Sequence, residues 1–142
     1  MCKFRSMIVL KTGDVLELEK SDSHSNIISH FQLKEGPLES RNFVKIEIWP
    51  KDNIFSTDHK DWEFHIDEEA TLPKWWEEDK NHFEDKCFES LFSFMKKVAK
   101  TGHFPCNLHI NADAKLDALK SVGGYLHINA GAKLDALKSV GG

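Results

Sequence analysis

The chain has 142 residues, of which 40% are hydrophobic, which is enough for one ordinary domain and a small appendage but excludes two large domains. Its longest early aliphatic run, Met7 to Leu10, is too short for a signal-peptide core or a membrane span. The three cysteines, Cys2, Cys87 and Cys106, form no CxxC pair, so neither a disulfide framework nor a thiolate zinc cage is indicated. We therefore expect a soluble, cytoplasmic protein with no membrane partner.

Charge is unevenly distributed along the chain, although the formal net charge is only −4. Residues 58–89 hold 12 acidic and 4 basic side chains, whereas residues 1–57 hold 8 of each kind. Phosphate contacts need a basic face, so this distribution argues against direct binding to nucleic acid. It favours a partner that is itself basic.

The first predicted elements are a β-hairpin and a short helix. Lys3 to Leu10 is a strand candidate, and after a turn the segment Val15 to Glu19 alternates with a period of two. Asp22 or Ser23 can then cap a helix that runs to about Leu33. The side chains expected on the buried side of this helix are Ile27, Ile28 and Phe31.

Two further strands and one long helix follow. Phe43 to Trp49 and Trp62 to Ile66 alternate apolar with polar residues, and Pro50 ends the first of these strands. The longest predicted helix opens at Pro73 and has about 27 residues, or ~40 Å. Its apolar stripe, which should cover the sheet, consists of Trp76, Phe83, Cys87, Leu91, Met95 and Val98.

A repeat of 18 residues occupies the C-terminal end. Leu108 to Gly124 recurs as Leu126 to Gly142 with one difference, Asp113 against Gly131. Such a period predicts stacked coils of a β-solenoid, with a short parallel strand at each Leu-His-Ile sequence and a corner at each Gly-Gly pair. A helix over Ala112 to Val122 is the alternative.

The predicted fold class is therefore α+β. An antiparallel sheet with a short and a long helix occupies residues 1–103, and a short two-coil β-solenoid occupies residues 104–142. A lone repeat cannot bury its own apolar face, so the first coil should lean on the N-terminal domain and the second coil on the first.

Two resemblances accompany the repeat. Its spacing is similar to that of the leucine-rich coils of receptor L-domain-type solenoids, and is carried by Leu116, Leu119, Val122, Gly124, Leu126 and Ile128. More narrowly, Ala118 to Leu126 resembles tandem repeats in uncharacterised bacterial and prophage proteins, in which a segment similar to Asp61–Phe64 and Pro73–Trp76 precedes the array. The resemblance implies a fold and a mobile-element setting, but supplies no catalytic residue.

The nearest approach to a metal motif is His103-x-x-Cys106-x-x-His109, whose residue types can bind zinc. No fourth ligand is evident. His109 also recurs as His127 within a predicted strand, whose alternation points both side chains outward. We therefore expect no bound metal.

Candidate catalytic residues have plainer structural interpretations. Cys87 could be a nucleophile, but its place on the apolar stripe predicts a buried core residue. Asp67, Glu68 and Glu69 could form an acid–base or magnesium cluster, but adjacent residues at a strand end diverge, which favours a solvated turn. No phosphate loop, nucleophile elbow or zinc-protease motif occurs, so we expect neither an enzyme nor a cofactor.

The functional hypothesis is a non-enzymatic protein-binding module with an acidic face. Trp75 and Trp76 are adjacent and cannot both enter one core, so Trp75 is either an exposed interface anchor or packs on a loop of its own domain. The predicted partner-binding residues are Trp75, Glu77, Glu78, Asp79, Glu84 and Asp85.

The expected partner is a basic protein such as a nucleic-acid-binding enzyme. Combined with the prophage resemblance, this suggests an inhibitor of a host defence nuclease, such as an anti-CRISPR protein. The alternative is a structural or self-assembling protein that forms a homo-oligomer through the solenoid end. A small metal-dependent enzyme is the third and least favoured alternative.

Overall fold

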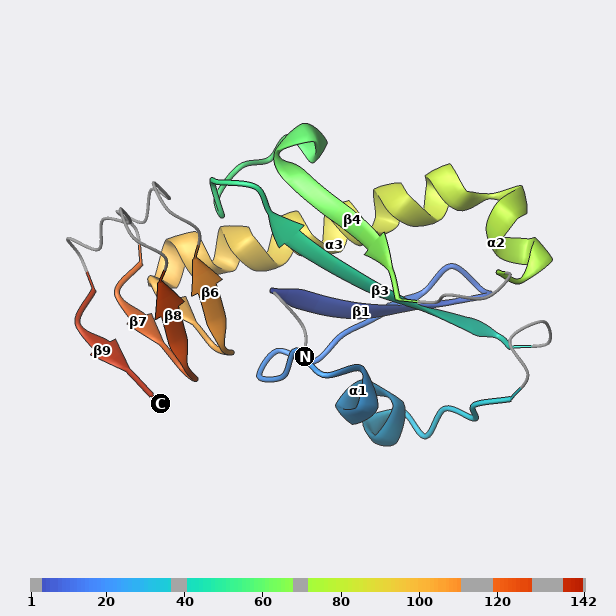
Figure 1. Ribbon diagram of the computed structural model, residues 1–142, viewed down its shortest axis with the longest axis horizontal. Coiled ribbons are helices and arrows are strands. Elements are labelled where there is room, and N and C mark those ends of the chain that lie inside the picture. The colour runs from blue at the N-terminus through green and yellow to red at the C-terminus, as the bar shows by residue number, and fades with distance from the viewer. Residues whose placement is uncertain (1–3, 37–40, 68–71, 111–118, 129–136, 142) are drawn as a thin grey trace.

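The computed structural model describes residues 4–36, 41–67, 72–110, 119–128 and 137–141, in which a sheet lies beside a long helix (Figure 1). The sheet has the strand order β2-β1-β3-β4, and each neighbouring pair is antiparallel. Its strands are β1 (Arg5–Leu10), β2 (Val15–Leu16), β3 (Phe43–Pro50) and β4 (Trp62–Ile66). These confirm the strand predictions, although β2 is shorter than expected and β3 includes Pro50. A 3-10 turn, η2 (His59–Asp61), lies between β3 and β4.

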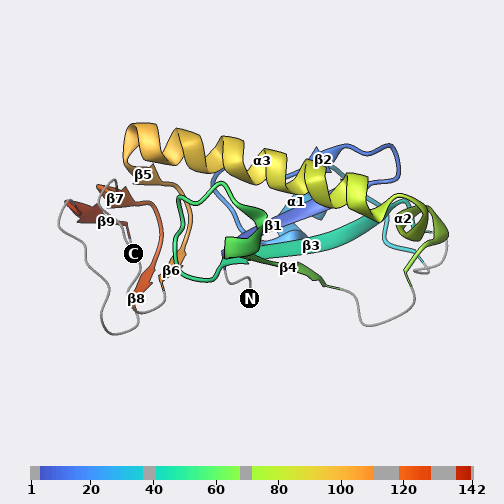
Figure 2. The same cartoon turned by 90° about the horizontal axis from the view of Figure 1, so that it is seen from above.

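Two helices cover opposite faces of this sheet. α3 (Lys80–Thr101) lies along one face, as Figure 2 shows, and α1 (His24–His30) packs against the other. Because side chains alternate along a strand, Met7 and Val9 of β1 join the apolar cluster under α3, whereas Ile8 packs with α1. The central strand β1 is thus buried on both faces.

The helix α1 starts at a capping serine, as predicted, but its buried side is narrower than expected. The Ser23 hydroxyl accepts a hydrogen bond from the backbone N–H of Asn26 at 3.4 Å. Ile27 is fully buried and Ile28 is partly buried, but Phe31 is 40% exposed, so the predicted burial of Phe31 is wrong. Phe31 is the C-cap residue, and beyond the last helical turn the helix no longer holds its side chain on the buried face.

The expected continuous helix of about 27 residues is wrong, because the chain forms two helices, α2 (Lys74–Glu78) and α3. Asp79 between them has φ −142° and ψ 30°, outside the helical region. The break lets two tryptophans reach one ring: Phe83 stacks on Trp76 with centroids 5.2 Å apart and meets Trp75 edge-on at 5.4 Å. The predicted stripe is confirmed, and its buried members are Trp76, Phe83, Cys87, Leu91, Met95 and Val98.

Beyond α3 the chain forms short parallel strands paired at the offset of the repeat. One ladder joins β6 (Leu108–Ile110) to β8 (Leu126–Ile128), and Leu108 lies opposite Leu126, as predicted. The other has the order β5-β7-β9, and its strands are β5 (His103–Phe104), β7 (Ser121–Val122) and β9 (Ser139–Val140).

These parallel ladders bear on the two interpretations of the repeat. The alternative helix would have included Ser121 and Val122, which instead form β7. Residues 111–118 and 129–136, on which the rest of each predicted coil falls, lie outside the described residues. The ladders are therefore established, while the complete solenoid coil stays a prediction.

The C-terminal strands share the apolar core of the sheet. The ring of Phe104 in β5 lies 5.1 Å from that of Phe4 and 5.7 Å from that of Phe94 on α3, measured between centroids. Further buried members of this core from the repeat region are Cys106, Leu108, Leu119 and Val122. The predicted domain boundary between residues 103 and 104 falls inside β5. No helix in the described part of the chain is long and apolar enough to cross a membrane.

Candidate functional site

Carboxylates gather around the break between α2 and α3, at the end of the molecule away from the C-terminal strands (Figure 1). Glu77, Glu78, Asp79 and Asp85 are exposed, and Glu84 is half-buried. None of the five forms an ion pair with a residue in the described ranges. The structure thus brings five of the six predicted partner-binding residues to one region, where no described residue forms an ion pair with them.

Trp75, the sixth predicted partner-binding residue, is tied to its own domain. Its indole N–H donates to the backbone carbonyl of Arg41 at 3.0 Å, and its ring contacts those of Trp76 and Phe83. The side chain is half-buried. These contacts within its own domain explain the position of the Trp75 side chain, and no binding partner is needed to explain it. The binding hypothesis therefore rests on the carboxylates.

A groove of about 590 Å³ lies between the β1–β2 hairpin and α3, and the residues that line it include the charged residue Arg5. Arg5 is only 1% exposed, and its Nε donates to Oε2 of Glu17 at 3.2 Å. Ser90 on α3 donates its hydroxyl to Oε1 of the same carboxylate at 2.8 Å. The Arg5 guanidinium also lies over the Phe94 ring, 3.8 Å from its centroid. Sequence analysis missed this network, although its strand alternation places Arg5 on the buried face.

The network continues from Arg5 to the C-terminal strands through Cys106. Arg5 Nη1 lies 3.5 Å from Sγ of Cys106, and the thiol donates to the backbone carbonyl of Glu19 at 3.1 Å. Lys97 hydrogen-bonds and pairs with the Glu19 carboxylate at 2.9 Å, which lowers the pKa of that carboxyl. These contacts hold together the N-terminal hairpin segment, α3 and the segment that contains Cys106.

The buried thiols lack the ionised form that a nucleophile or a zinc ligand needs. Burial raises the pKa of Cys106 to about 11, and burial also raises the pKa of Cys87 well above its ordinary value. Both thiols are free and buried, as predicted for Cys87. At neutral pH they stay protonated, which favours a structural role for each.

The three side chains considered for zinc do not converge. His103 Nδ1 lies 2.7 Å from Oγ of Ser121, while the thiol of Cys106 donates to the backbone carbonyl of Glu19. The ring of His109 instead faces that of His127. Within the described ranges, no group of three or more His, Cys, Asp or Glu side chains is arranged to hold a metal ion.

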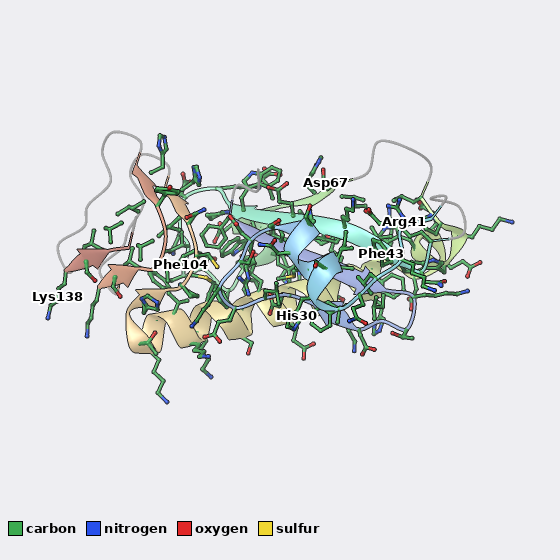
Figure 3. The ribbon with its side chains drawn as sticks, turned by 90° about the horizontal axis from the view of Figure 1, so that it is seen from below. His30, Arg41, Phe43, Asp67, Phe104 and Lys138 are labelled. Carbon is green, nitrogen blue, oxygen red and sulfur yellow. The ribbon has the colours of Figure 1, made fainter. Side chains whose placement is uncertain are left out.

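The carboxylate at the end of β4 joins two elements of the fold. Asp67 Oδ2 lies 3.3 Å from Nδ1 of His24, at the start of α1, and Figure 3 shows Asp67 beside that helix. The other ring nitrogen of His24 lies 2.7 Å from the backbone oxygen of Ile46. Glu68 and Glu69 lie outside the described residues. The contacts of His24 with Asp67 and Ile46 thus anchor α1 to the sheet.

No family model, no curated protein and no solved structure matches the chain.

Proposed function

We propose that the protein is a non-enzymatic binding module that recognises a basic protein through the carboxylates at the α2–α3 break. The observation that carries the proposal is their common placement without compensating ion pairs in the described part of the chain. Complementary charge steers a partner during diffusion and fixes its orientation on contact. We name this surface the acidic junction, and its residues are Glu77, Glu78, Asp79, Glu84 and Asp85.

A nucleic-acid-binding enzyme is the partner class whose chemistry suits the acidic junction. The groove of such an enzyme is lined with Lys and Arg side chains that neutralise phosphates, and carboxylates can take the place of those phosphates. The resemblance of residues 118–126 to prophage repeats supports a more specific form of the proposal. In this form, the protein inhibits a host defence nuclease in the manner of an anti-CRISPR protein.

The experiment compares two variants that lose equal charge at different places. The test variant neutralises the acidic junction and carries Glu77→Gln, Glu78→Gln, Asp79→Asn, Glu84→Gln and Asp85→Asn. The control neutralises the same number of exposed Glu and Asp residues elsewhere and carries Asp14→Asn, Glu19→Gln, Glu35→Gln, Asp52→Asn and Glu63→Gln. Both should fold. The test variant breaks no ion pair with a described residue, and the surface ion pairs that the control breaks contribute only ~0–1 kcal/mol each.

Each variant and the wild-type chain would be used to capture partners from host-cell lysate, and recovered proteins would be identified by mass spectrometry. We expect the wild type and the control, but not the test variant, to retain the same basic nucleic-acid-binding protein. Purified complexes should dissociate as salt rises and should be competed by nucleic acid. Equal affinity of the test variant and the control for the recovered protein would contradict the proposal.

Self-association is a second candidate, and one internal comparison favours it. Val122 and Val140 are equivalent residues of the repeat, yet Val122 is 2% exposed and Val140 is 41% exposed. Val122 belongs to the common apolar core, and β7 is paired on both sides by β5 and β9, whereas the described residues place no strand against the outer edge of β9. Figure 3 shows Lys138 at this outer edge. An open strand edge with apolar side chains is a template for pairing with another chain.

Sedimentation velocity over a concentration series tests this candidate. Val140→Lys should abolish any association through β9, whereas Phe31→Lys is a matched control because Phe31, the C-cap residue of α1, is almost equally exposed, at 40%. A monomer at every concentration, or an association that survives Val140→Lys, would exclude assembly through this edge.

A further inference from the structure

Parallel pairing brings two histidines of the repeat side by side. The β6–β8 ladder places His109 directly opposite His127, and their ring centroids lie 5.4 Å apart with the ring planes inclined by 37°. His109 is half-buried and His127 is exposed, so the pair lies at the surface. The register of the ladder, rather than local sequence, therefore creates this pair.

The pair differs from the other six histidines of the chain, all of which are described. His24 and His103 each make a hydrogen bond through the ring. The remaining four contact an aromatic ring, and they are His30, His59, His65 and His82. No described residue hydrogen-bonds to the ring of His109 or His127. The two imidazoles contact each other, and no other described side chain occupies their ring nitrogens.

The separation of the rings suits a single divalent ion. Two imidazoles that bind one tetrahedral ion at the usual Zn–N distance of about 2.0–2.1 Å have ring centres about 5 Å apart. The observed 5.4 Å is close to this value. Imidazole nitrogen is a preferred ligand for zinc, copper and nickel, so the chemistry of the donors and their spacing agree.

We propose that His109 and His127 together bind one exchangeable first-row divalent cation, with water in the remaining coordination positions. The described residues supply no third ligand of the His, Cys, Asp or Glu type, whereas a closed structural zinc site uses four protein ligands. It is also distinct from the acidic junction, which lies at the other end of the molecule (Figure 1).

Such an ion would link metal binding to the pairing of the two repeats. The two ligands are 18 residues apart in sequence and come together only when β6 and β8 are in register. A ligand that binds the folded arrangement and not the unfolded chain stabilises the fold in proportion to its occupancy. Zinc should therefore raise the melting temperature of the protein.

Calorimetric titration of the full chain with Zn²⁺ alone tests the proposal. We expect one equivalent per chain, and a loss of affinity of at least about tenfold when either His109→Gln or His127→Gln removes one ligand. His103→Gln is the matched control, because His103 lies in the neighbouring ladder and hydrogen-bonds to Ser121. It should bind zinc like the wild type.

Two further readouts keep the test independent of folding. Imidazole signals of His109 and His127 should shift together during a zinc titration followed by NMR, and zinc should raise the melting temperature of the wild type but not of His127→Gln. Absence of zinc binding, or binding that survives His127→Gln unchanged, would overturn the proposal. Equal loss of binding in His103→Gln would also overturn it, since the ligands would then lie elsewhere.

Discussion

Replacing Arg5 tests whether the buried network at the groove holds the protein together. Arg5→Met keeps an unbranched side chain beside Phe94 but removes the positive charge that pairs with Glu17. Among the described residues, only Ser90 would still donate a hydrogen bond to the Glu17 carboxylate. Its remaining negative charge would then lie in a partly buried site without a counter-ion.

The expected loss of stability follows from the burial of the two partners. Removing one member of a buried ion pair costs about 3–5 kcal/mol, because the other charge is left uncompensated. Arg5 is 1% exposed, but the Glu17 side chain is 21% exposed and keeps some access to water. We therefore expect Arg5→Met to cost about 3 kcal/mol, at the lower end of that range.

Urea unfolding of four proteins would separate the ion pair from packing. These are the wild type, Arg5→Met, Glu17→Gln and the double variant. The double variant should be more stable than the sum of the single losses predicts, because it leaves no unpaired charge. A matched control in the same groove is Lys97→Met, which breaks the exposed pair with Glu19 and should cost no more than ~1 kcal/mol. If Arg5→Met cost as little as Lys97→Met, the assigned role of the network would be refuted.

Two further predictions concern the C-terminal strands. Val122→Ala should lower the free energy of unfolding, measured in urea, by about 1–3 kcal/mol. Val140→Ala is the same change at the equivalent exposed position, and it should alter this free energy by no more than about 0.5 kcal/mol. Similar losses in the two variants would contradict the described burial. Burial raises the pKa of Cys106 from 9.0 to about 11. The folded state therefore holds the thiol proton more tightly than the unfolded chain does. The stability that this proton contributes is complete below pH 9 and is lost as the pH rises through 11. Alkylation of Cys106 in the folded protein should accordingly be slow at pH 8 and accelerate towards pH 11, and rapid labelling at pH 8 without unfolding would contradict this.

The sheet could be predicted from the sequence because alternation is local information. Val44, Ile46 and Ile48 recur with the period of a strand, and all three are buried in β3. The repeat was equally informative, since its offset of 18 residues sets which residues of the parallel ladders face each other. Patterns of this kind do not depend on distant parts of the chain.

The features that could not be predicted depend on contacts between distant residues. Asp79 interrupts a helical pattern whose apolar spacing is regular on both sides, and the break is accompanied by the joint contact of two tryptophans with Phe83. Arg5 is buried because Glu17, on the neighbouring strand segment, and Ser90, on a helix 73 residues beyond Glu17, meet beside it. Neither environment is visible in a window of neighbouring residues.

The two repeats have nearly the same sequence but contribute unequally to the fold. Leu119 of the first repeat is fully buried in the common core, whereas its equivalent Leu137 is only partly buried against it. Local opening should therefore cost less in the second repeat than in the first, because described residues of the second repeat are less buried than their equivalents in the first. A cation shared by His109 and His127 would tie the second repeat to the first, and a second copy against β9 would cover Val140. The cation and the second copy would each bind to the second repeat. Because this repeat has weaker contacts of its own, the free energy of binding would have its largest effect on the fraction of molecules in which the second repeat is paired with the first.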